Sequence, residues 1–567
     1  MMKSTLVPVL FFCCCVPLTA QTPSFSWVKP VFVAPQVVPL AAAISDLDAD
    51  PAGNTYVTGE FQGQLNFGAG NIINGNGNNP TLFLAKYAPD GTVLWVKQGN
   101  PQMPADNFAF HKSSKIAVDA AGNVYWCASF RADAVDFGSG VTITRTCTND
   151  CEEGFLLKLN TNGVVVFQKP IRAAVGEQLF LSGIACDSIG RHYLTGSYTG
   201  NEIWLQGGAN IGGLTTQGYF LCAYTPEGAA EWVNFQTETS ATPSSETIDV
   251  SPDGERIVVS GTYNAFSVDF SNGAITSSNA LEKRFVVWYN TIGQPQGAGT
   301  LTAGQNLMLF DLKLDDQYRA WVAGNYSGAL EWNNTALAPA PSSTSAGMLA
   351  VLSPGAAGTL AVSIDHTLLS VPVNTVALGP GATFFCGGLA GEPVSVPGTS
   401  VITNNGCLDA ILIGGTGQAV QLAQNAGGAG CEKVDNFYGG SAMATDAAGN
   451  LLMAGTFENG GVFGSSSFAG NGLWVAKMST GLVDAVEPVV QKISIQPNPA
   501  AHSVQLTFPE NTSGRCRILS VTGRIMSEMP VQATHLLEVA GWPAGIYLLE
   551  YLDEKGSKMI QKLAVEH

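Results

Sequence analysis

Charge is scarce in this 567-residue sequence, in which Asp, Glu, Lys and Arg together make up only 12% of the residues. Soluble domains usually carry about a quarter. Basic residues are the scarcer kind, because 26 Lys and Arg stand against 44 Asp and Glu, for a formal net charge of −18. Binding to nucleic-acid phosphates or to an anionic lipid surface needs clustered Lys and Arg. The composition therefore argues against both partners, and we interpret the acidic surplus as loop residues that keep a weakly charged surface soluble.

Sequence motifs of the common enzyme classes are absent as well. None of the six histidines belongs to an HExxH pair, no GxSxG nucleophile elbow occurs, and no GxxxxGK phosphate loop occurs. The Gly-x-Gly pieces lie at turn signals rather than ahead of helices. We therefore expect no catalytic residue, no metal site and no cofactor, although paired carboxylates can also meet from distant parts of a fold.

Long apolar runs are missing except at the start of the chain. Lys3 precedes an apolar run from Leu6 to Leu18, and Thr19-Ala20 supplies small residues before Gln21. This pattern predicts a signal peptide over residues 1–20, which is too short to span a membrane stably. Lipid attachment within Cys13–Cys15 is the alternative, but Phe12 stands where a small residue normally precedes a lipidated cysteine.

Cysteine is sparse, and export permits disulfides. Removing residues 1–20 reduces the twelve cysteines to nine, so at least one thiol stays free or pairs outside the chain. Cys147 and Cys151 share one polar loop and are candidates for a local pair, and Cys407 with Cys431 is a second candidate. Metal ligation is the other interpretation, but no CxxC or His-rich spacing supports it.

The main feature that is present is an internal repeat. Its first unit reads AISDLDADPAGNTYVTGEF, QLNFGAG and TLFLAKYAPDGTVLWVKQ, and its second reads KIAVDAAGNVYWCASF, AVDFGSG and GFLLKLNTNGVVVFQK. Five units follow, and the fifth and sixth are the weakest. The turn position recurs every 63 to 69 residues, at Gly53, Gly122, Gly190, Gly254, Gln317, Gly381 and Gly449. Seven units therefore cover roughly residues 43–481.

Each unit carries strand signals. Runs such as Thr55–Thr58 and Leu82–Ala85 are short and β-rich, and Gly-Asn, Asp-Gly and Asn-Gly pairs separate such runs. A unit of this kind predicts a four-stranded antiparallel meander, and about four to eight such units build a β-propeller. We therefore expect an all-β fold, with a seven-bladed β-propeller over residues 21–482.

The ends of the repeat indicate how the ring closes. The seventh unit stops after its third strand, at Lys477–Gly481, and lacks the counterpart of Leu94–Gln98. The segment Phe25–Lys29, near the start of the chain, matches that missing strand. We predict that this segment completes the last blade, because the ring then has no open sheet edge.

Recurring aromatic and acidic residues each admit two interpretations. A large aromatic recurs in the fourth strand, at Trp27, Trp95, Phe167 and Trp232, and another in the second strand, at Tyr56, Tyr125 and Tyr193. A sugar-stacking platform is possible, but packing between blades is favoured. Asp46, Asp48 and Asp50 alternate ahead of Gly53 and could bind calcium. Only one of the three recurs, as Asp119, Asp187 and Asp446, so a turn-capping role is favoured.

The repeats resemble the SBBP β-propeller repeats of secreted bacterial proteins. The resemblance rests on DxxGNxYxTG at Asp50–Gly59 and on FLAKYAPDGTVLW at Phe83–Trp95, and it spans about four-fifths of the chain. Units five and six depart from the pattern. The resemblance implies a propeller and no shared catalytic residues.

The pattern changes after the repeats, where residues 483–491 read as a linker. Residues 492–567 carry seven basic and seven acidic residues and are neutral, so the whole net charge lies in the preceding part. Ser503–Phe508 alternates like a half-buried strand, and Thr-Gly and Pro-Ala-Gly turns separate further strands. We predict a separate small, immunoglobulin-like β-sandwich.

This last segment is similar to the type A C-terminal sorting domain of the type IX secretion system of Bacteroidota. The motifs that carry the similarity are PNP, VTGR, PAGIY and a basic tail, and their key residues are Pro497, Asn498, Pro499, Gly523, Gly545, Tyr547, Lys558 and Lys562. The similarity implies passage across the outer membrane, removal of this domain, and release or surface attachment of the remainder. The alternative is a generic sandwich whose Pro and Gly only form turns.

Together these features favour a secreted or cell-surface, non-catalytic propeller exported by the type IX secretion machinery. Its partner would be an extracellular protein or glycan, bound through loops that vary over a rigid scaffold. The first alternative is a secreted polysaccharide- or peptide-acting enzyme with a site in the propeller channel. The second is a spacer or coat component without a small ligand.

Overall fold

The computed structural model of the chain is all-β, and no helix occurs among the residues it describes. It describes residues 23–566 except for these gaps: 36–41, 77–78, 103–113, 148–150, 174–176, 201, 206–208, 213–216, 237–242, 266, 271–273, 277–282, 356–357, 367–370, 397–398, 400, 404–407, 427–430, 435–441, 483–493, 497–499, 509–513, 521–524, 532–533 and 554–557. The chain divides into two compact units, Met1–Val483 and Asp484–His567. The predicted signal peptide lies outside the described residues.

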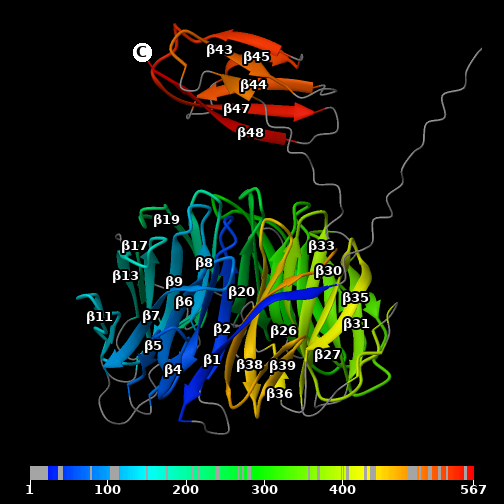
Figure 1. The fold of residues 1–567 in the computed structure, drawn as a ribbon. Helices are drawn as coiled ribbons and strands as arrows, with labels where there is room; N and C mark the ends of the chain where they lie inside the picture. The colour runs from blue at the N-terminus through cyan, green and yellow to red at the C-terminus, as the bar shows by residue number, and fades with distance from the viewer. Residues whose placement is uncertain are drawn as a thin grey trace, which may run out of the picture. The chain divides into compact units, whose positions relative to one another are not determined.

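The first unit contains seven antiparallel sheets, each built on four strands (Figure 1). We number the sheets in chain order and call the first of the four strands the inner strand and the last the outer strand. The first sheet has β2 (Ala42–Ala49), β3 (Thr55–Phe61), β6 (Thr81–Tyr87) and β7 (Val93–Gln102). The second has β8 (Lys115–Val118), β9 (Val124–Phe130), β12 (Glu153–Leu159) and β13 (Val165–Ala173). The third has β14 (Gln178–Cys186), β15 (His192–Thr199), β18 (Gln217–Tyr224) and β19 (Ala230–Gln236).

The remaining four sheets repeat this order. The fourth has β20 (Ser244–Val250), β21 (Arg256–Tyr263), β24 (Lys283–Asn290) and β25 (Pro295–Ala303). The fifth has β26 (Leu307–Leu314), β27 (Ala320–Tyr326), β30 (Ser345–Leu352) and β31 (Thr359–His366). The sixth has β32 (Val371–Gly379), β33 (Thr383–Ala390), β34 (Asp409–Thr416) and β35 (Ala419–Ala426). The seventh has β37 (Met443–Thr445), β38 (Leu451–Glu458), β41 (Gly472–Ser479) and β1 (Ser24–Ala34), and β36 (Cys431–Lys433) also pairs with β38.

The N-terminal strand β1 supplies the outer strand of the seventh sheet. It pairs antiparallel with β41, from Ser24 opposite Ser479 to Phe32 opposite Gly472. The inner strands contact one another in chain order, and β37 contacts β2, so the series of contacts closes on itself. Neighbouring sheets share their apolar cores, since Leu84 of the first sheet packs in one cluster with Trp126 and Leu157 of the second.

In six of the seven units the short middle segment forms an extra hairpin that the sequence did not predict, whereas in the sixth unit the described residues show only a single bridge there, between Val394 and Ile402. Four of these hairpins pair with the outer strand of the preceding sheet: β4 (Gln64–Asn66) and β5 (Ile72–Asn74) on β1, β10 (Ala134–Asp136) and β11 (Thr142–Thr144) on β7, β16 (Glu202–Leu205) and β17 (Ala209–Gly212) on β13, and β28 (Leu330–Trp332) and β29 (Thr335–Ala338) on β25. Two form separate two-stranded sheets: β22 (Ser267–Asp269) with β23 (Ala274–Thr276), and β39 (Gly461–Phe463) with β40 (Ser466–Phe468). Each paired hairpin therefore extends its neighbour's sheet.

The second unit is a sandwich of two antiparallel sheets. One sheet has β42 (Ser494–Gln496), β43 (Ser503–Thr507) and β46 (Thr534–Glu538). The other has β44 (Gly514–Ser520), β45 (Ile525–Pro530), β47 (Gly545–Asp553) and β48 (Lys558–Val565). Val504 and Leu506 of the first sheet share one buried cluster with Ile518 and Leu549 of the second.

Two cysteine predictions have different outcomes. The local pair is confirmed, because Cys147 and Cys151 form a disulfide. Cys431 is also disulfide-bonded, but Cys407 lies outside the described residues, so the second predicted pair stays a prediction. Cys127, Cys186, Cys222, Cys386 and Cys516 are free thiols.

Candidate functional site

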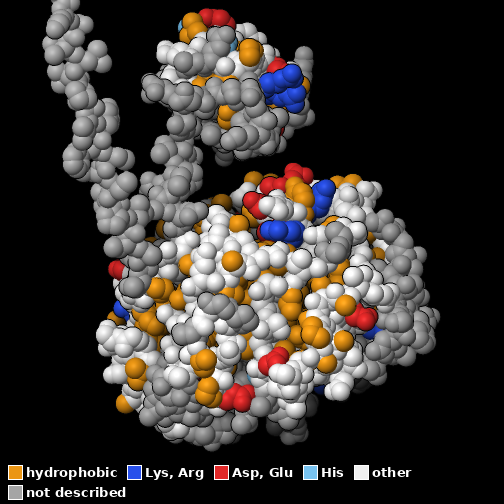
Figure 2. Space-filling view, turned by 90° about the vertical axis from the view of Figure 1, so that its right-hand side faces the viewer, with side chains coloured by type: hydrophobic (Ala, Val, Ile, Leu, Met, Phe, Trp, Pro, Cys, Tyr) orange, Lys and Arg blue, Asp and Glu red, His pale blue; other side chains and the backbone are white. Residues whose placement is uncertain are grey.

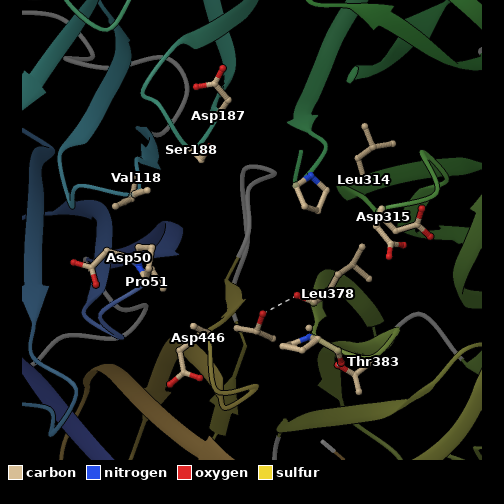
Figure 3. A pocket seen from close by; sticks show the side chains of 18 of the residues that line it. Asp50, Pro51, Val118, Asp187, Ser188, Leu314, Asp315, Leu378, Thr383 and Asp446 are labelled. Carbon is tan, nitrogen blue, oxygen red and sulfur yellow. Dashed lines mark hydrogen bonds between the residues drawn. The ribbon is translucent and has the colours of Figure 1, made fainter. Parts of the chain in front are cut away.

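The turns between the first two strands of all seven sheets surround one pocket of about 560 Å³, which we call the mouth pocket (Figure 3). Each sheet contributes at least one lining residue, for example Pro51, Ala120, Ser188, Pro252, Leu314, Pro380 and Ala447. Segments spread over nearly 400 residues of sequence therefore meet at this one place. The side chains just named are mostly small and apolar.

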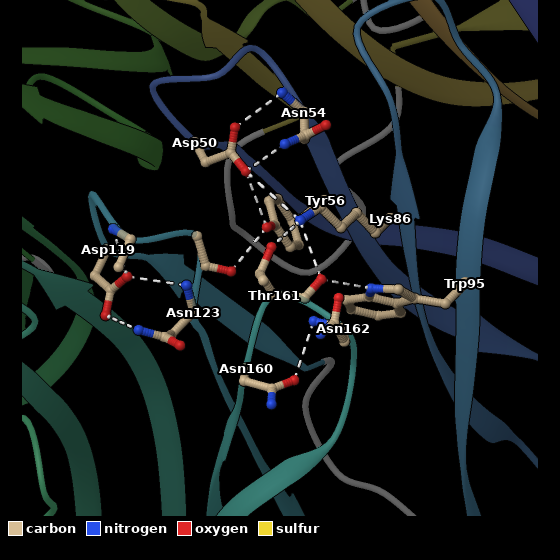
Figure 4. A network of polar contacts seen from close by, with 12 residues as sticks. Asp50, Asn54, Tyr56, Lys86, Trp95, Asp119, Asn123, Asn160, Thr161 and Asn162 are labelled. Atoms are coloured by element: carbon tan, nitrogen blue, oxygen red, sulfur yellow. Dashed lines mark hydrogen bonds and ion pairs between the residues drawn. The ribbon is translucent and has the colours of Figure 1, made fainter.

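The repeated aspartate of these turns folds back onto its own turn, which confirms the capping interpretation. Asp50 accepts hydrogen bonds from the backbone N–H of Asn54 at 2.9 Å and from its Nδ2 at 2.6 Å (Figure 4). Asp119 and Asp446 accept the same pair of bonds from Asn123 and Asn450. Figure 3 shows the carboxylates of Asp50, Asp187 and Asp446 pointing away from the middle of the pocket. Asp119, Asp315, Asp316 and Arg319 also line the pocket, so a ligand would meet a largely apolar wall with a few charged groups.

The recurring aromatic side chains connect neighbouring sheets. The hydroxyl of Tyr56 donates to the carbonyl of Gly122 at 2.9 Å, and Nε1 of Trp95 donates to the carbonyl of Thr161 at 3.0 Å (Figure 4). Lys86 of the first sheet donates to Oγ1 of the same threonine at 2.6 Å. The Trp95 ring also lies over the positive-φ turn of Gly163. The packing interpretation of these aromatics therefore holds, and the sugar platform is not needed to explain them.

The fifth turn departs from the repeat. Its positive-φ residue is Tyr318, at φ 59°, and not Gln317 as the sequence spacing predicted. This backbone region is unfavourable for a bulky residue. The Tyr318 hydroxyl donates to Asp253 at 2.7 Å, and the guanidinium of Arg256 lies 5.0 Å from the ring centre, so contacts with the fourth sheet hold the tyrosine in place. Because the fifth turn has no glycine to align with those of the other turns, its sequence gave no signal for this one-residue shift.

Below the mouth pocket the inner strands line a second cavity of about 190 Å³, which we call the deep section. It contains four carboxylates and two lysines: Asp46, Asp48, Asp249, Asp311, Lys115 and Lys313. Val118 and Cys186 line both cavities, so the two adjoin. Asp249 and Asp311 occupy the repeat positions of Asp48 and Asp46 in the fourth and fifth sheets, so the aligned repeat carried a signal for this cluster that the sequence reasoning missed.

The carboxylates of the deep section bind backbone amides of the next sheet. Asp46 accepts from the N–H of Ile116 at 2.9 Å, and Asp48 accepts from Val118 at 2.8 Å. Asp249 accepts from Leu314 at 2.7 Å, and Asp311 accepts from Val376 at 2.9 Å. These bonds satisfy donors on the inner edge strands, which have no sheet partner on that side. The four carboxylates therefore link consecutive sheets.

The surroundings of the deep section shift the pKa values of two of its carboxylates and of Lys313. Desolvation raises the pKa of Asp48 to about 6, despite the opposing charge of Lys313 and two backbone hydrogen bonds. Desolvation also raises the pKa of Asp249 to about 6. Desolvation lowers the pKa of Lys313, but the surrounding carboxylates, first among them Asp249, outweigh it and raise that pKa. Lys313 Nζ lies 4.0 Å from Asp249 Oδ1 and acts as an internal counter-ion.

Neither calcium nor another metal is suggested by this geometry. Among the described residues, no group of three or more His, Cys, Asp or Glu side chains is placed to hold a metal ion. Oxygens of Asp46, Asp48 and Asp50 accept backbone or side-chain N–H groups instead.

The predicted sorting residues are only partly described. Tyr547 on β47 is buried, and its hydroxyl donates to the carbonyl of Pro543 at 2.7 Å. Gly545 begins the same strand, and Lys558 and Lys562 lie on β48, opposite Leu552 and Leu548. Pro497, Asn498, Pro499 and Gly523 lie outside the described residues. The structure brings Gly545, Tyr547 and the two lysines onto one pair of strands.

The face of the molecule shown in Figure 2 carries little charge, as the composition suggests. On the face shown in Figure 2, the described acidic and basic side chains are few and scattered among polar and apolar groups. No helix among the described segments is long and apolar enough to span a membrane.

Comparison with protein families identifies the last segment. Residues 494–566 match the model described as a secretion system C-terminal sorting domain. The match confirms the predicted similarity to a C-terminal sorting domain, and the type A assignment stays a prediction. It supports handling by the type IX secretion system and a secreted or outer cell-surface location.

Comparison with known proteins adds little beyond this segment. Curated proteins give no match. One similar solved structure is a polysaccharide lyase, an ulvan lyase with a bound saccharide, at 12% identity over 76% of this chain and 94% of that chain, with a TM-score of 0.37. Another is the extracellular domain of a hybrid two component system from B. thetaiotaomicron, at 8% identity over 95% of this chain and all of that one, with a TM-score of 0.17. At such TM-scores neither likeness carries an argument about function.

Proposed function

We propose that this chain is a secreted or cell-surface binding protein, without catalytic activity, that holds an extracellular protein partner at the mouth pocket. The observation that carries the proposal is the wall of that pocket, where turns from all seven sheets converge and the repeated aspartates point away. A concave site with apolar walls is the usual form of a ligand pocket. An apolar segment of a partner protein fits such a wall better than a charged polysaccharide does.

The finer architecture belongs to the same proposal. We take the first unit as a seven-bladed β-propeller of SBBP-type repeats, which the seven sheets and the closed series of inner-strand contacts support. We take the second unit as an immunoglobulin-like sandwich, supported by its two antiparallel sheets around one core. Residues 1–20 are taken as a cleaved signal peptide on sequence grounds.

The deep section holds the carboxylate cluster that the channel-enzyme alternative would use, and its geometry favours a structural role. A general acid or nucleophile needs an oxygen that can reach substrate. Both oxygens of Asp46 and of Asp48 already accept backbone amides. Lys313 is held among four carboxylates. These contacts support the binding hypothesis over the channel-enzyme alternative.

The test uses paired arginine substitutions in two turns. Ala120 and Ala447 line the mouth pocket, whereas the next residues, Ala121 and Ala448, do not line it and are also exposed. The full chain is first used to capture extracellular proteins and glycans from a defined panel. We expect Ala120→Arg and Ala447→Arg to abolish binding of the partner found, because the long side chain fills the pocket.

The matched controls Ala121→Arg and Ala448→Arg should bind like the unmodified chain. Equal binding by all four variants would place the partner elsewhere and refute the mouth pocket. Hydrolysis of a polysaccharide or peptide panel by the purified chain, lost in Ala120→Arg, would support the enzyme alternative instead.

A further inference from the structure

A further cavity lies between the third and fourth sheets, apart from the mouth pocket and the deep section. It has a volume of about 240 Å³ and is lined by the outer strand β19, by Tyr219, by Phe270, and by Tyr289 with the turn that follows it. We call it the side cleft. None of its described lining residues is an acid or a base. Phenol, amide, phenyl and aliphatic groups make up its side-chain wall.

The side cleft exists because this interface departs from the repeat. Strand registers place Asn234 and Tyr289 of this interface where the first and second sheets have Lys97 and Leu159. In the same register Tyr219 corresponds to Leu82. The adjoining hairpin also differs, since β22 and β23 form a separate sheet, while the hairpin of β10 and β11 joins β7 through β10. At these positions the side cleft therefore has neutral polar side chains where the other interface has a lysine and two leucines.

Two tyrosine hydroxyls in the cleft share a single hydrogen bond. The oxygens of Tyr219 and Tyr289 are 2.6 Å apart, and the residues are only 1% and 3% exposed. Each hydroxyl carries one proton, and one proton suffices for the bond between them. The second proton therefore has no acceptor among the described groups. A buried donor without an acceptor is costly, so this proton calls for an acceptor inside the cleft.

From this geometry we propose that the side cleft binds one ring of a neutral saccharide. A sugar hydroxyl can accept the free tyrosine proton, and the side-chain amide of Gln294, whose Oε1 already accepts from Asn290 Nδ2 at 3.3 Å, can donate to a neighbouring hydroxyl. Phe270 and Ile292 supply apolar surface for the C–H face of the ring. The volume is below that of drug-sized ligand pockets, which suits one ring rather than a chain segment. The absence of charge in the described wall favours neutral sugars over uronic acids or amino sugars.

The experiment titrates the full chain with a defined sugar panel by calorimetry and by saturation-transfer NMR. The panel contains the methyl glycosides of glucose, galactose, mannose and xylose, with glucuronic acid and glucosamine as charged contrasts. We expect binding of at least one neutral glycoside with a Kd in the range of about 1 to 10 mM. The two charged sugars should bind at least about 10-fold more weakly, because the cleft offers no counter-ion.

Two variants and their matched controls locate the site. Tyr289→Phe removes one hydroxyl while keeping the ring, and it should weaken binding about 10-fold. Tyr263→Phe is its control, because Tyr263 lies in the same sheet and shares an equivalent bond with Thr300 outside the cleft. Ile292→Arg blocks the rim at a residue that is 60% exposed, and Asn162→Arg changes the matching turn of the second sheet.

The proposal stands if Tyr289→Phe and Ile292→Arg lose binding and both controls keep it. It is overturned if no neutral glycoside binds at up to about 50 mM, or if binding survives in both cleft variants. A signal that disappears in Ala120→Arg but not in Ile292→Arg would assign the sugar to the mouth pocket instead. Sugar binding in the side cleft does not require the protein partner proposed for the mouth pocket.

Discussion

At the residue scale, His192 shows how one buried group sets a pH limit on the fold. Its ring lies between Tyr125 and Tyr224, with ring centres 4.3 and 5.3 Å away, and the residue is fully buried. Burial lowers the pKa of His192 to about 4 from its ordinary 6.5. The unfolded chain therefore binds a proton between pH 6.5 and 4 that the folded chain does not. This group's contribution to stability is present above pH 6.5 and is lost as pH falls toward 4.

We predict that His192→Phe removes this acid sensitivity while keeping the stacked arrangement. The unmodified chain should lose up to about 3 kcal/mol of unfolding free energy through this group between pH 6.5 and 4. The variant should lose less, which thermal melts at pH 7, 5.5 and 4.5 will measure. His502→Gln, at an exposed histidine, is the control. A variant that loses as much stability as the unmodified chain over this range would contradict the prediction.

Single residues were predictable where the chain alone sets the geometry. The Asp50 turn was identified because Asp, Gly and Asn stand in fixed order and bond to one another within four residues. The Tyr318 turn was placed one residue too early, because its positive φ is held by Asp253 in another sheet. The side cleft was not foreseen either, since Tyr219 and Tyr289 are 70 residues apart.

At the element scale, β1 joins the two ends of the repeat. Its placement costs chain entropy, because its partner β41 lies far away in the sequence. In return, the edges of β41 and β4 are no longer unpaired. It pairs with β41 on one side and with β4 on the other. Val31 and Val33 are 1% exposed and pack in the cluster shared by the first and seventh sheets. A strand contacting both ends of the repeat acts as the closing element of the unit.

We predict that deleting Ser24–Val33 lowers the melting temperature by at least about 5 °C, because β41 and β4 lose their partner and the valine cluster opens. Truncation before Ser24 is the control and should have no effect of this size. A peptide of residues 24–34 added in excess should restore part of the loss, since it can pair with β41 again. An unchanged melting temperature in the deletion variant would refute the closing role.

Elements were predictable in proportion to how local their pairing is. The four-stranded meanders followed from short β-rich runs and Asp-Gly or Asn-Gly turns, because neighbouring strands join through those turns. The extra hairpins were missed although their segments recur, as in Gln64–Asn66 and Ala134–Asp136. These two hairpins pair with the sheet of the preceding unit, and the order of strands along the chain does not predict such a pairing.

At the scale of the whole molecule, the seven inner strands present a stability problem that the deep section solves at three contacts: the first sheet with the second, the fourth with the fifth, and the fifth with the sixth. Each inner strand is an edge of its sheet, and unpaired edge amides favour aggregation or need other partners. Asp46, Asp48, Asp249 and Asp311 accept amides of the following sheet, and Lys313 balances part of their charge. The arrangement couples the stability of separate sheets through one shared electrostatic centre.

We predict that Lys313→Met destabilises the unit in a pH-dependent way. The folded-state pKa of Asp48 and of Asp249 is about 6, above the ordinary 3.8, so their ionisation weakens the folded state as pH rises through 6. Removing Lys313 takes away the charge that opposes this, and the carboxylates then repel one another more strongly. The melting temperature should therefore fall most at pH 8 and much less at pH 5, where both carboxyls bind protons in the folded state.

Thermal melts at pH 5, 6.5 and 8 will test this against Lys97→Met. Lys97 is the matched control because its side chain packs over the Gly163 turn and does not line the deep section. A loss of stability in Lys313→Met that is the same at all three pH values would mean that only packing was removed. The expected result is a difference in melting temperature between Lys313→Met and the unmodified chain that grows with pH and is absent in Lys97→Met. Such a result requires a shared electrostatic centre, because no contact within a single sheet brings Lys313 close to carboxylates of the first and fourth sheets at once.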